Sequence, residues 1–499
     1  MLSQNELVGC ELLLSHYVVI LFLMVSERFR WVYCQLDTLR RCFPSSIRKT
    51  LKELPETLDE TYERTLEEIP KEKKQHAHRL FQCLVAAIRP LYVEELAEIF
   101  TIEFDQDAAH NLMEGWRPVN PEEAVLSACS TLITVIDNDE SSKIVQFSHF
   151  SVKEFLTSDR LRTSEIKNIR HYYIPLNAAH TILAQACLTV LLQMDSKIDK
   201  KRLATFPLAF YAAQHWLDHA KYEDVEPRVQ DAMKELFNPS KPYLASWIWI
   251  GDVDEDRKTI DKNPAPDHPS VPKATALYYA VSRGLCGLAK YLISTHGEDV
   301  NANCGYHGTP LYAASNGGHF DAVSLLLDHG ANVNITNRRG RLLPLCAAYR
   351  GEHLDVMRLL LERGAAPDVR YDSFGPIIHA ASRYGHAEVI RLLLRHEADV
   401  NAIGLMKYTP LHWASDVGYT NIVQILLDHG ANINALITHG TPLYMASAHG
   451  HLEVVRLLLA RGADMHIPTY LGYTPLSVAT SMKHTQVAQL LLEHGTEKE

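Results

Sequence analysis

The C-terminal half of the chain repeats one pattern of hydrophobic and polar positions. In the stretch YTPLHWASDVGYTNIVQILLDHGANINA, residues 408–435, two apolar faces at helical spacing are separated by one glycine and closed by a second. Units with this frame begin at residues 275, 309, 343, 376, 409, 441 and 474. The spacing stays between 32 and 34 residues, so the pattern predicts a solenoid of stacked helix pairs.

Each residue type in a unit has a physical role. Thr409 is placed to cap the first helix, and Pro410 suits the first helical position because that position needs no backbone donor. Gly418 and Gly430 are expected to end the first and second helices in a left-handed conformation. Glu397 stands where other units have the second glycine, so we expect a weak point there, at a cost of ~1 kcal/mol.

The second helix of most units carries three consecutive apolar residues. These triplets are 325–327, 359–361, 392–394, 425–427, 457–459 and 490–492. A single partner helix cannot cover three adjacent side chains, so we expect the triplets to be buried between neighbouring units on both sides. One unit of 32 to 34 residues alone cannot offset its own loss of conformational entropy, which also requires stacking.

The opening T-P-L-H-x-A and the period resemble ankyrin repeats, and seven units cover residues 275–499. The resemblance implies an α-solenoid with short β-hairpins that binds protein partners on a concave face. His412 could suggest a catalytic residue, but its position holds tyrosine, cysteine, histidine or serine in other units. We therefore interpret it as a packing residue with hydrogen bonds. The histidines of the "GH" and "HG" pairs are repeat positions in the same sense.

Helical and strand patterns also precede the repeats. Apolar residues at helical spacing predict a helix over 58–69, and QHAHRLFQCLVAAIRPLYVEELAEIF predicts two helices broken at Pro90. A third helix is expected from Pro121. TLITVID and KIVQFSH read as a hairpin, and FSVKEFL as a further helix. Three helices followed by a hairpin is the order of a winged helix.

Several pieces of this region, in order, resemble the segment after the nucleotide-binding core of fungal NACHT–ankyrin proteins. The pieces are FRWVYCQLDTLRRC, LPETLDETYERTL, HAHRLFQCLVAAIRPLYVEELAEIF and FSHFSVKEFL. That family consists of signal-transducing NTPases related in architecture to NOD-like receptors. The resemblance implies these domains: an apolar segment of uncertain status at 1–27, the end of a NACHT module at 28–75, a winged-helix-like domain at 76–160, a helical linker domain at 161–250, a linker at 251–274 and the repeats at 275–499.

The phosphate loop of that family, G-x-x-x-x-G-K-[ST], does not occur in this sequence. Its glycines and lysine form the cradle for the phosphates, so nucleotide hydrolysis is not carried over. No G-x-S-x-G, H-E-x-x-H or Cys-x-x-Cys string occurs either. We expect no enzyme activity, cofactor or metal. The alternative is that the chain is the C-terminal part of an NTPase whose core lies upstream.

Composition and charge narrow the possible partners. The net charge of −11 argues against general nucleic-acid binding, and residues 76–160 hold fourteen acidic against six basic side chains. A winged-helix DNA regulator is therefore the disfavoured alternative. Nine scattered cysteines without a secretory signal indicate an intracellular, cytoplasmic protein. The uncharged run 12–25 is too short to span a bilayer, so membrane anchoring through 7–25 is also disfavoured. The alternatives are that this segment is a helix or strand of a core, or that it comes from a faulty gene model.

In ankyrin arrays the two residues before the "GH" position and the hairpin tips face the concave side. The residues that this frame assigns to partner binding are Arg283, Asn316, Arg338, Arg339, Arg350, Arg383, Tyr384, Met406, Tyr408, Asp416, His449 and Met482. Arginine and tyrosine are frequent in binding hot spots, and arginines gather at the middle of the set. The hypothesis is a protein ligand that presents carboxylates to this middle. The sequence does not define the oligomeric state.

Overall fold

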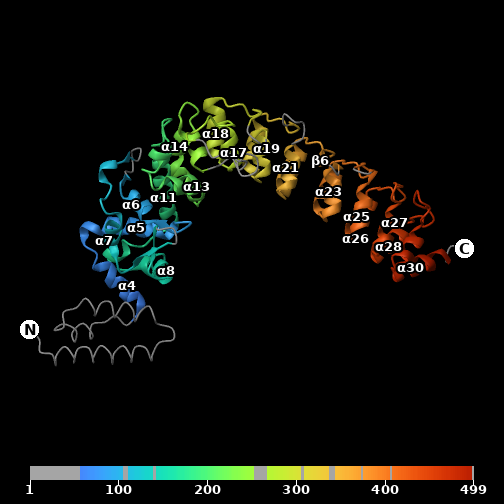
Figure 1. Cartoon of the computed structure of the whole chain (residues 1–499), viewed down its shortest axis with the longest axis horizontal. Coiled ribbons are helices and arrows are strands. Elements are labelled where there is room, and N and C mark those ends of the chain that lie inside the picture. The colour runs from blue at the N-terminus through green and yellow to red at the C-terminus, as the bar shows by residue number, and fades with distance from the viewer. Residues whose placement is uncertain are drawn as a thin grey trace, which may run out of the picture. The chain divides into compact units, whose positions relative to one another are not determined.

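The computed structural model describes residues 57–104, 111–138, 142–251, 267–304, 308–336, 343–372, 375–404 and 407–496. The apolar segment 7–25 and the NACHT-like residues 28–56 lie outside these ranges. The chain divides into two compact units, residues 1–272 and residues 273–499 (Figure 1). Among the described residues, no helix combines the length and the apolar character needed to cross a membrane.

The first unit contains a winged helix. Its elements are α5 (Lys74–Ala86), β1 (Leu91–Tyr92), α6 (Val93–Ile99), α7 (Pro121–Cys129), β4 (Ile133–Asp137), β5 (Lys143–Phe147) and α8 (Phe150–Leu156). The expected hairpin is confirmed, with Val135 opposite Val145. Strand β1 was missed by the sequence analysis; it pairs with β5 and completes an antiparallel sheet of order β1-β5-β4. The break at Pro90 is thus a short strand between two helices, because Pro90 cannot donate within a helix.

Two small elements extend the winged helix. The short strands β2 (Ile102–Glu103) and β3 (Asn111–Leu112) pair with each other, and the 3₁₀ helix η2 (Glu114–Trp116) follows them. Helix α7 begins at Pro121, as expected, and Asn120 caps it by accepting from the backbone N–H of Glu123. The side chain of Lys143 on β5 donates to Glu122 at 2.7 Å, so an acidic residue of this third helix is paired with the wing.

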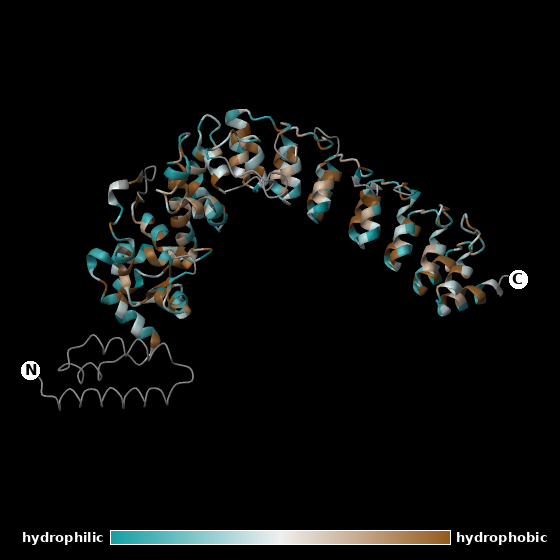
Figure 2. Cartoon of the chain, viewed as in Figure 1, coloured by the Kyte–Doolittle hydropathy of each residue, from teal (hydrophilic) through white to brown (hydrophobic). Residues whose placement is uncertain are grey.

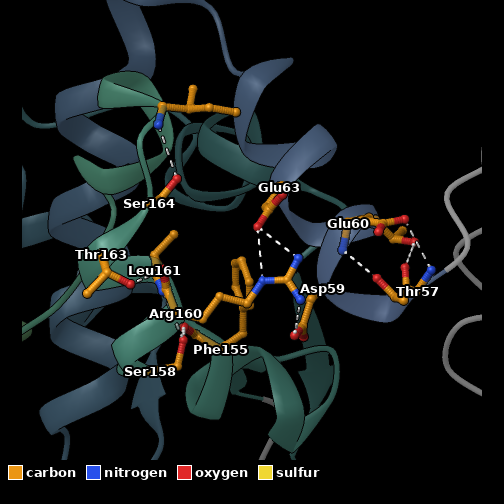
Figure 3. Close-up of polar contacts among 12 residues, drawn as sticks. Thr57, Asp59, Glu60, Glu63, Phe155, Ser158, Arg160, Leu161, Thr163 and Ser164 are labelled. Atoms are coloured by element: carbon orange, nitrogen blue, oxygen red, sulfur yellow. Dashed lines mark hydrogen bonds and ion pairs between the residues drawn. The ribbon is translucent and has the colours of Figure 1, made fainter.

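Helix α4 (Leu58–Glu67), which the 3₁₀ helix η1 (Lys71–Lys73) follows, packs against this domain. Thr57 and Glu60 form its N-terminal capping box. Arg160 donates to Asp59 at 3.0 Å and to Glu63 at 3.2 Å, so one guanidinium joins two turns of α4 to α9 (Asp159–Thr163) (Figure 3). The helix ends at Glu67, two residues earlier than expected, although Ile69 is still buried.

Further helices complete the first unit. They are α10 (Lys167–Arg170), α11 (Leu176–Leu191), α12 (Lys200–Leu203), α13 (Ala209–Ala220), α14 (Glu226–Leu236) and α15 (Tyr243–Gly251). Helices α11 and α13 pack closely, and Glu98 of the winged helix connects to them. Its buried carboxylate accepts from Arg117 at 2.8 Å and from the backbone N–H of Leu208 at 2.7 Å. Each oxygen of this buried carboxylate therefore accepts a hydrogen bond.

The second unit consists of helix pairs, seven in the described part of the chain. They are α17 (Ala276–Ser282) with α18 (Cys286–His296), α19 (Pro310–Asn316) with α20 (Phe320–Asp328), α21 (Pro344–Arg350) with α22 (Leu354–Glu362), α23 (Ile377–Tyr384) with α24 (Ala387–Arg395), α25 (Pro410–Val417) with α26 (Thr420–Asp428), α27 (Pro442–Ala448) with α28 (Leu452–Ala460), and α29 (Pro475–Ser481) with α30 (Thr485–Thr496). We number them repeats 1 to 7. The short strands β6 (Arg370–Asp372) and β7 (Gly375–Pro376) pair between repeats 3 and 4. The expected fold class, a helical solenoid with short hairpins behind a winged helix, is confirmed.

The core of the array lies between the helices. In Figure 2 hydrophobic residues run along the helices of this unit, and hydrophilic residues gather at their ends and in the loops. The expectation for the apolar triplets was partly wrong. The middle residue is buried in every triplet, but all three are buried only at 359–361, and Leu492 of the last repeat is 55% exposed. The two helices of one repeat cover the middle residue of the triplet. The burial of the first and third residues depends on how closely the next repeat approaches.

Hydrogen bonds between repeats fix their spacing. Asn301 donates its side-chain amide to the Gly330 carbonyl and accepts from the backbone N–H of Asn332. Asn334 and Asn401 donate in the same way to Gly364 and Gly430. Histidines at the second position of the "GH" pair form a second series, also where the glycine is replaced. The imidazoles of His319, His353, His451 and His484 each bond a carbonyl at the end of the preceding first helix, at 2.9 to 3.1 Å.

Candidate functional site

His412 is a packing residue. Its side chain is fully buried, and its Nδ1 lies 2.8 Å from the Thr409 hydroxyl and accepts from the Thr409 backbone N–H. Its Nε2 lies 3.3 Å from the carbonyl oxygen of Gly440, which identifies the neutral tautomer protonated at Nε2. Burial lowers the pKa of His412 to about 4. Thr409 is the N-cap of α25, as expected, and forms a capping box with His412, whose imidazole its hydroxyl also contacts. Thr309 and Thr441 cap as expected.

The residues assigned to partner binding lie at two neighbouring positions at the ends of the first helices and in the hairpin loops. We call the surface formed by these residues and the adjoining loops the inner face. Three of the twelve, Arg338, Arg339 and Met406, lie outside the described residues. Arg283, Asn316 and Met482 belong to repeats 1, 2 and 7, and Met482 is 59% exposed. The remaining six lie in the central repeats and make the contacts described next.

Arg383 is the centre of an aromatic cluster in repeats 4 and 5. Its guanidinium carbon lies 4.8 Å from the ring centroid of Trp413 and 5.9 Å from that of Tyr384. The Trp413 ring lies 4.6 Å from the Tyr408 ring, which is 6.1 Å from the imidazole of His439. Tyr384 is half exposed, so the cluster offers both aromatic surface and a cation to a ligand.

Arg350 forms a second polar centre one repeat earlier. Its Nη1 donates to the hydroxyl of Tyr312 at 3.4 Å. Burial lowers the pKa of this guanidinium, but the hydroxyls of Tyr312 and Tyr371 offset that effect and raise the pKa overall. Arg350 is therefore charged at any physiological pH and is exposed enough to meet a ligand carboxylate.

Asp416 and His449 form a third contact. The His449 Nδ1 lies 3.3 Å from the Asp416 carboxylate, which becomes an ion pair when the imidazole is protonated. The sequence analysis missed Trp413, which stands where other repeats have mostly small or aliphatic residues. A large aromatic residue at that position was the available signal. Along the inner face, the charge changes from basic in repeats 3 and 4, which carry Arg350 and Arg383, to mixed in repeats 5 and 6, which carry Asp416 and His449.

In the ranges that the structure describes, no group of three His, Cys, Asp or Glu side chains is arranged to hold a metal ion. The six described cysteines form no disulfide with one another, and burial raises the pKa of Cys83 to about 12. Such a thiol is inert as a nucleophile. The arrangement of cations and aromatic rings suits recognition of a protein surface.

Comparison with known proteins agrees with this architecture. The family model "Ankyrin repeats (3 copies)" matches residues 257–337, 277–372, 343–437 and 435–499. The model "GPI inositol-deacylase, winged helix domain" matches residues 62–167. The chain thus carries ankyrin repeats behind an N-terminal winged-helix domain. Because ankyrin repeats generally bind proteins, it contains a protein-binding module.

Individual relatives cover parts of the chain. Azaphilone pigments biosynthesis cluster protein L of Monascus ruber is 30% identical over 296 residues, which are 57% of this chain and 61% of that protein. The chain thus spans about three fifths of the length of this relative. The human ASB11 ankyrin repeat domain is 28% identical and covers 44% of this chain and 98% of its own, with a TM-score of 0.38. The ankyrin repeat domain of Bcl-3, a member of the IkappaB protein family, is 29% identical and covers 45% and 100%, with a TM-score of 0.40.

Proposed function

We propose that this chain is a non-enzymatic, cytoplasmic binding component of a NACHT-type signalling protein, and that its ankyrin array holds a protein partner on the inner face. The observation that carries the proposal is the cluster of Arg383, Tyr384, Tyr408 and Trp413. Arginine and large aromatic side chains supply most binding energy in protein interfaces. Here they are already packed against one another, so little side-chain entropy is lost on binding.

The partner presents an acidic segment to the middle of the inner face. Arg350 and Arg383 lie in adjacent repeats at the same position of the frame, so their guanidinium groups address successive carboxylates of an extended or looped ligand. Asp416 in the next repeat carries the opposite charge and sets the limit of the acidic segment. Charge order along the face then fixes the direction in which the ligand binds.

The test uses two double variants of the full chain as bait in a pull-down experiment. The proteins to be captured come from a lysate of the organism that produces this chain. Charge reversal in R350E/R383E is expected to remove the captured partner, with affinity reduced at least tenfold. The variant R395E/R456E makes the same change of net charge on second helices and is the matched control. Equal capture by both variants and by the unaltered chain would place the binding site elsewhere.

The alternative assignment is the C-terminal part of a signal-transducing NTPase, and the resemblance of residues 28–75 to the end of a NACHT module supports it. We further propose that the winged helix and the helices of 161–250 act there as a structural relay rather than a DNA reader. The ion pair between Glu122 and Lys143 supports this role, because it neutralises a cation of the wing that could otherwise contact a DNA phosphate. Mapping the 5′ end of the transcript distinguishes the alternatives: an in-frame upstream phosphate loop makes the product an NTPase.

A further inference from the structure

The first helix of repeat 3 carries a much larger side chain at one position than the first helices of the other repeats. Tyr349 occupies a position that holds serine or threonine in repeats 2, 4, 5, 6 and 7 and valine in repeat 1. Small side chains at this position let neighbouring first helices approach. Tyr349 is only 5% exposed, so its ring occupies the space between repeats 3 and 4. It lies against Tyr371, at 4.9 Å between centroids, and its hydroxyl bonds His386 at 3.1 Å.

The junction between repeats 3 and 4 is accordingly looser than the others. Among the described residues, α21 with α23 and α22 with α24 make the sparsest contacts between equivalent helices of neighbouring repeats. His386 bonds the Tyr349 hydroxyl instead of a helix-end carbonyl. Asp368 replaces the bridging asparagine; it accepts from the backbone N–H of Asp399 but has no amide to donate.

A hollow of about 380 Å³ opens at this junction, on the side of the second helices. Its walls are apolar and include Tyr349, Leu354, Met357, Ala387 and Val389. We call it the repeat 3–4 slot. A volume of this size accommodates one large aliphatic or aromatic side chain of a ligand.

A second hollow, of about 660 Å³, lies beside the slot between α20 and α22. The two hollows share Glu352 and Leu354, so they form one continuous groove around the start of α22. Phe320 lines the second hollow and is 46% exposed. The groove therefore presents apolar surface at two points separated by one helix.

The rim of the groove is acidic. Glu352, Asp355 and Glu362 line it against one cation, Arg358, and Glu388 adds a fourth carboxylate at the slot. Within the described residues, no cation forms an ion pair with Glu352, Asp355 or Glu362. Glu352 also holds a left-handed φ of 60° where five other repeats have glycine. A charged side chain thus stands at the shared edge of both hollows although its backbone conformation favours glycine.

We propose that this groove, which adjoins the inner face, is a second binding site for a basic peptide segment of a partner protein. One apolar side chain of the peptide enters the repeat 3–4 slot, and flanking lysines or arginines pair with Glu352 and Asp355. Glu388 is already paired with Arg391 at 3.6 Å. The charge complementarity excludes the acidic ligand expected on the inner face. The array would then hold two segments of opposite charge at once, on adjoining surfaces.

The proposal can be tested with a phage-displayed library of random twelve-residue peptides selected on the full chain. Three variants are compared with the unaltered chain. E352G/D355N removes two carboxylates and restores the glycine of other repeats. A387F fills the mouth of the slot with the residue that repeat 2 has at the same position, Phe320. E453Q is the matched control, because Glu453 occupies the position of Asp355 in repeat 6.

The expected result is a set of peptides with an apolar residue between basic ones, enriched on the unaltered chain and on E453Q. Their affinity, measured by fluorescence anisotropy, should fall at least fivefold on E352G/D355N and on A387F, and should decrease with added salt. The proposal is overturned if the peptides lost on these variants are acidic or neutral, or if no peptide distinguishes them from E453Q. Peptides that respond only to R350E/R383E report on the inner face, so failure at one site is separable from failure at the other.

Discussion

At the scale of single residues, the array tolerates departures from its own pattern at a measurable cost. Glu397 has a left-handed φ of 64° at a position where four neighbouring repeats have glycine, and the weak point expected there from the sequence rests on this conformation. Glu352 and Lys483 hold similar angles at the other helix end. Each is a non-glycine residue in a conformation that glycine adopts without steric cost, so each weakens its own repeat.

Replacing Glu397 by glycine is expected to raise the free energy of unfolding by about 1 kcal/mol, because the left-handed conformation no longer opposes a Cβ atom. Urea denaturation measures the change. The reciprocal variant is Gly430→Ala, at φ of 84° with open space around the added Cβ, and it should lose a similar amount. A neutral effect of both variants would show that these helix ends relax without cost.

His412 should make stability dependent on pH. Its pKa is about 4 in the folded chain against an ordinary value of 6.5, so between these values the unfolded chain binds more protons. The free energy of unfolding therefore falls as the pH drops from 6.5 toward 4, by about 3 kcal/mol from this residue at the lower end.

The matched variant for this effect is H412Y, since repeats 2 and 6 use tyrosine at the same position. Urea denaturation from pH 7 to 4.5 should show a shallower pH dependence for the variant. The other buried histidines, such as His219 with a pKa of about 3, are present in both proteins, so the difference between the curves belongs to His412. Parallel curves would contradict the assignment.

At the scale of elements, apolar packing and not ion pairing decides which segments are held firmly. Helix α4 makes both kinds of contact, and Figure 3 shows its ion pairs with Arg160. Its Tyr62 is fully buried with the ring 5.4 Å from that of Phe155, and its hydroxyl bonds Ser151 at 2.8 Å. The Arg160 contacts lie at the surface, with Arg160 46% and Asp59 43% exposed in their side chains.

We therefore expect R160A to lower the free energy of unfolding by less than about 1 kcal/mol, since exposed ion pairs are screened by solvent. Y62A should cost roughly 3 to 5 kcal/mol through the cavity that it creates. Y62F, which removes only the hydrogen bond to Ser151, should cost about 1 kcal/mol. Urea denaturation of the three variants gives the order, and a larger loss for R160A than for Y62A would reverse this account of α4.

At the scale of the molecule, the array is a row of repeats whose stability depends on each junction. The junction between repeats 3 and 4 lacks the close helix contacts, the bridging amide and the histidine-to-carbonyl bond found at others. The same place opens the slot and lies between the arginines of the inner face. Looser packing at this junction exposes a binding surface, but it makes the unfolding of the array less cooperative.

Native-state hydrogen exchange should accordingly show two blocks in the array, residues 273–372 and 375–496, that open with different free energies. The Y349S variant installs the serine of repeats 2, 4, 5 and 6 and should let α21 and α23 approach, so that the two blocks open together. Exchange that is already uniform across the junction in the unaltered chain would show that the slot does not weaken it.

The sequence alone determined the period, the helix pairs, the winged-helix order and the glycine-dependent helix ends. These features depend on local patterns: apolar spacing, caps, prolines and left-handed positions. The repeat frame also predicted which residues line the inner face, because it assigns each position a direction, and that assignment stays a prediction. The resemblance to NACHT–ankyrin proteins suggested a role in signalling. That role remains a proposal, because the fold alone does not define it.

The tertiary structure alone decided what depends on contacts between distant residues. Strand β1 has only two residues and is a strand because β5 pairs with it. Trp413 becomes part of the inner face through the guanidinium of Arg383, and the repeat 3–4 slot exists because the ring of Tyr349 separates two helices. A repeat pattern records what the units share, whereas a binding surface is made where one unit differs and its neighbours must adapt to it.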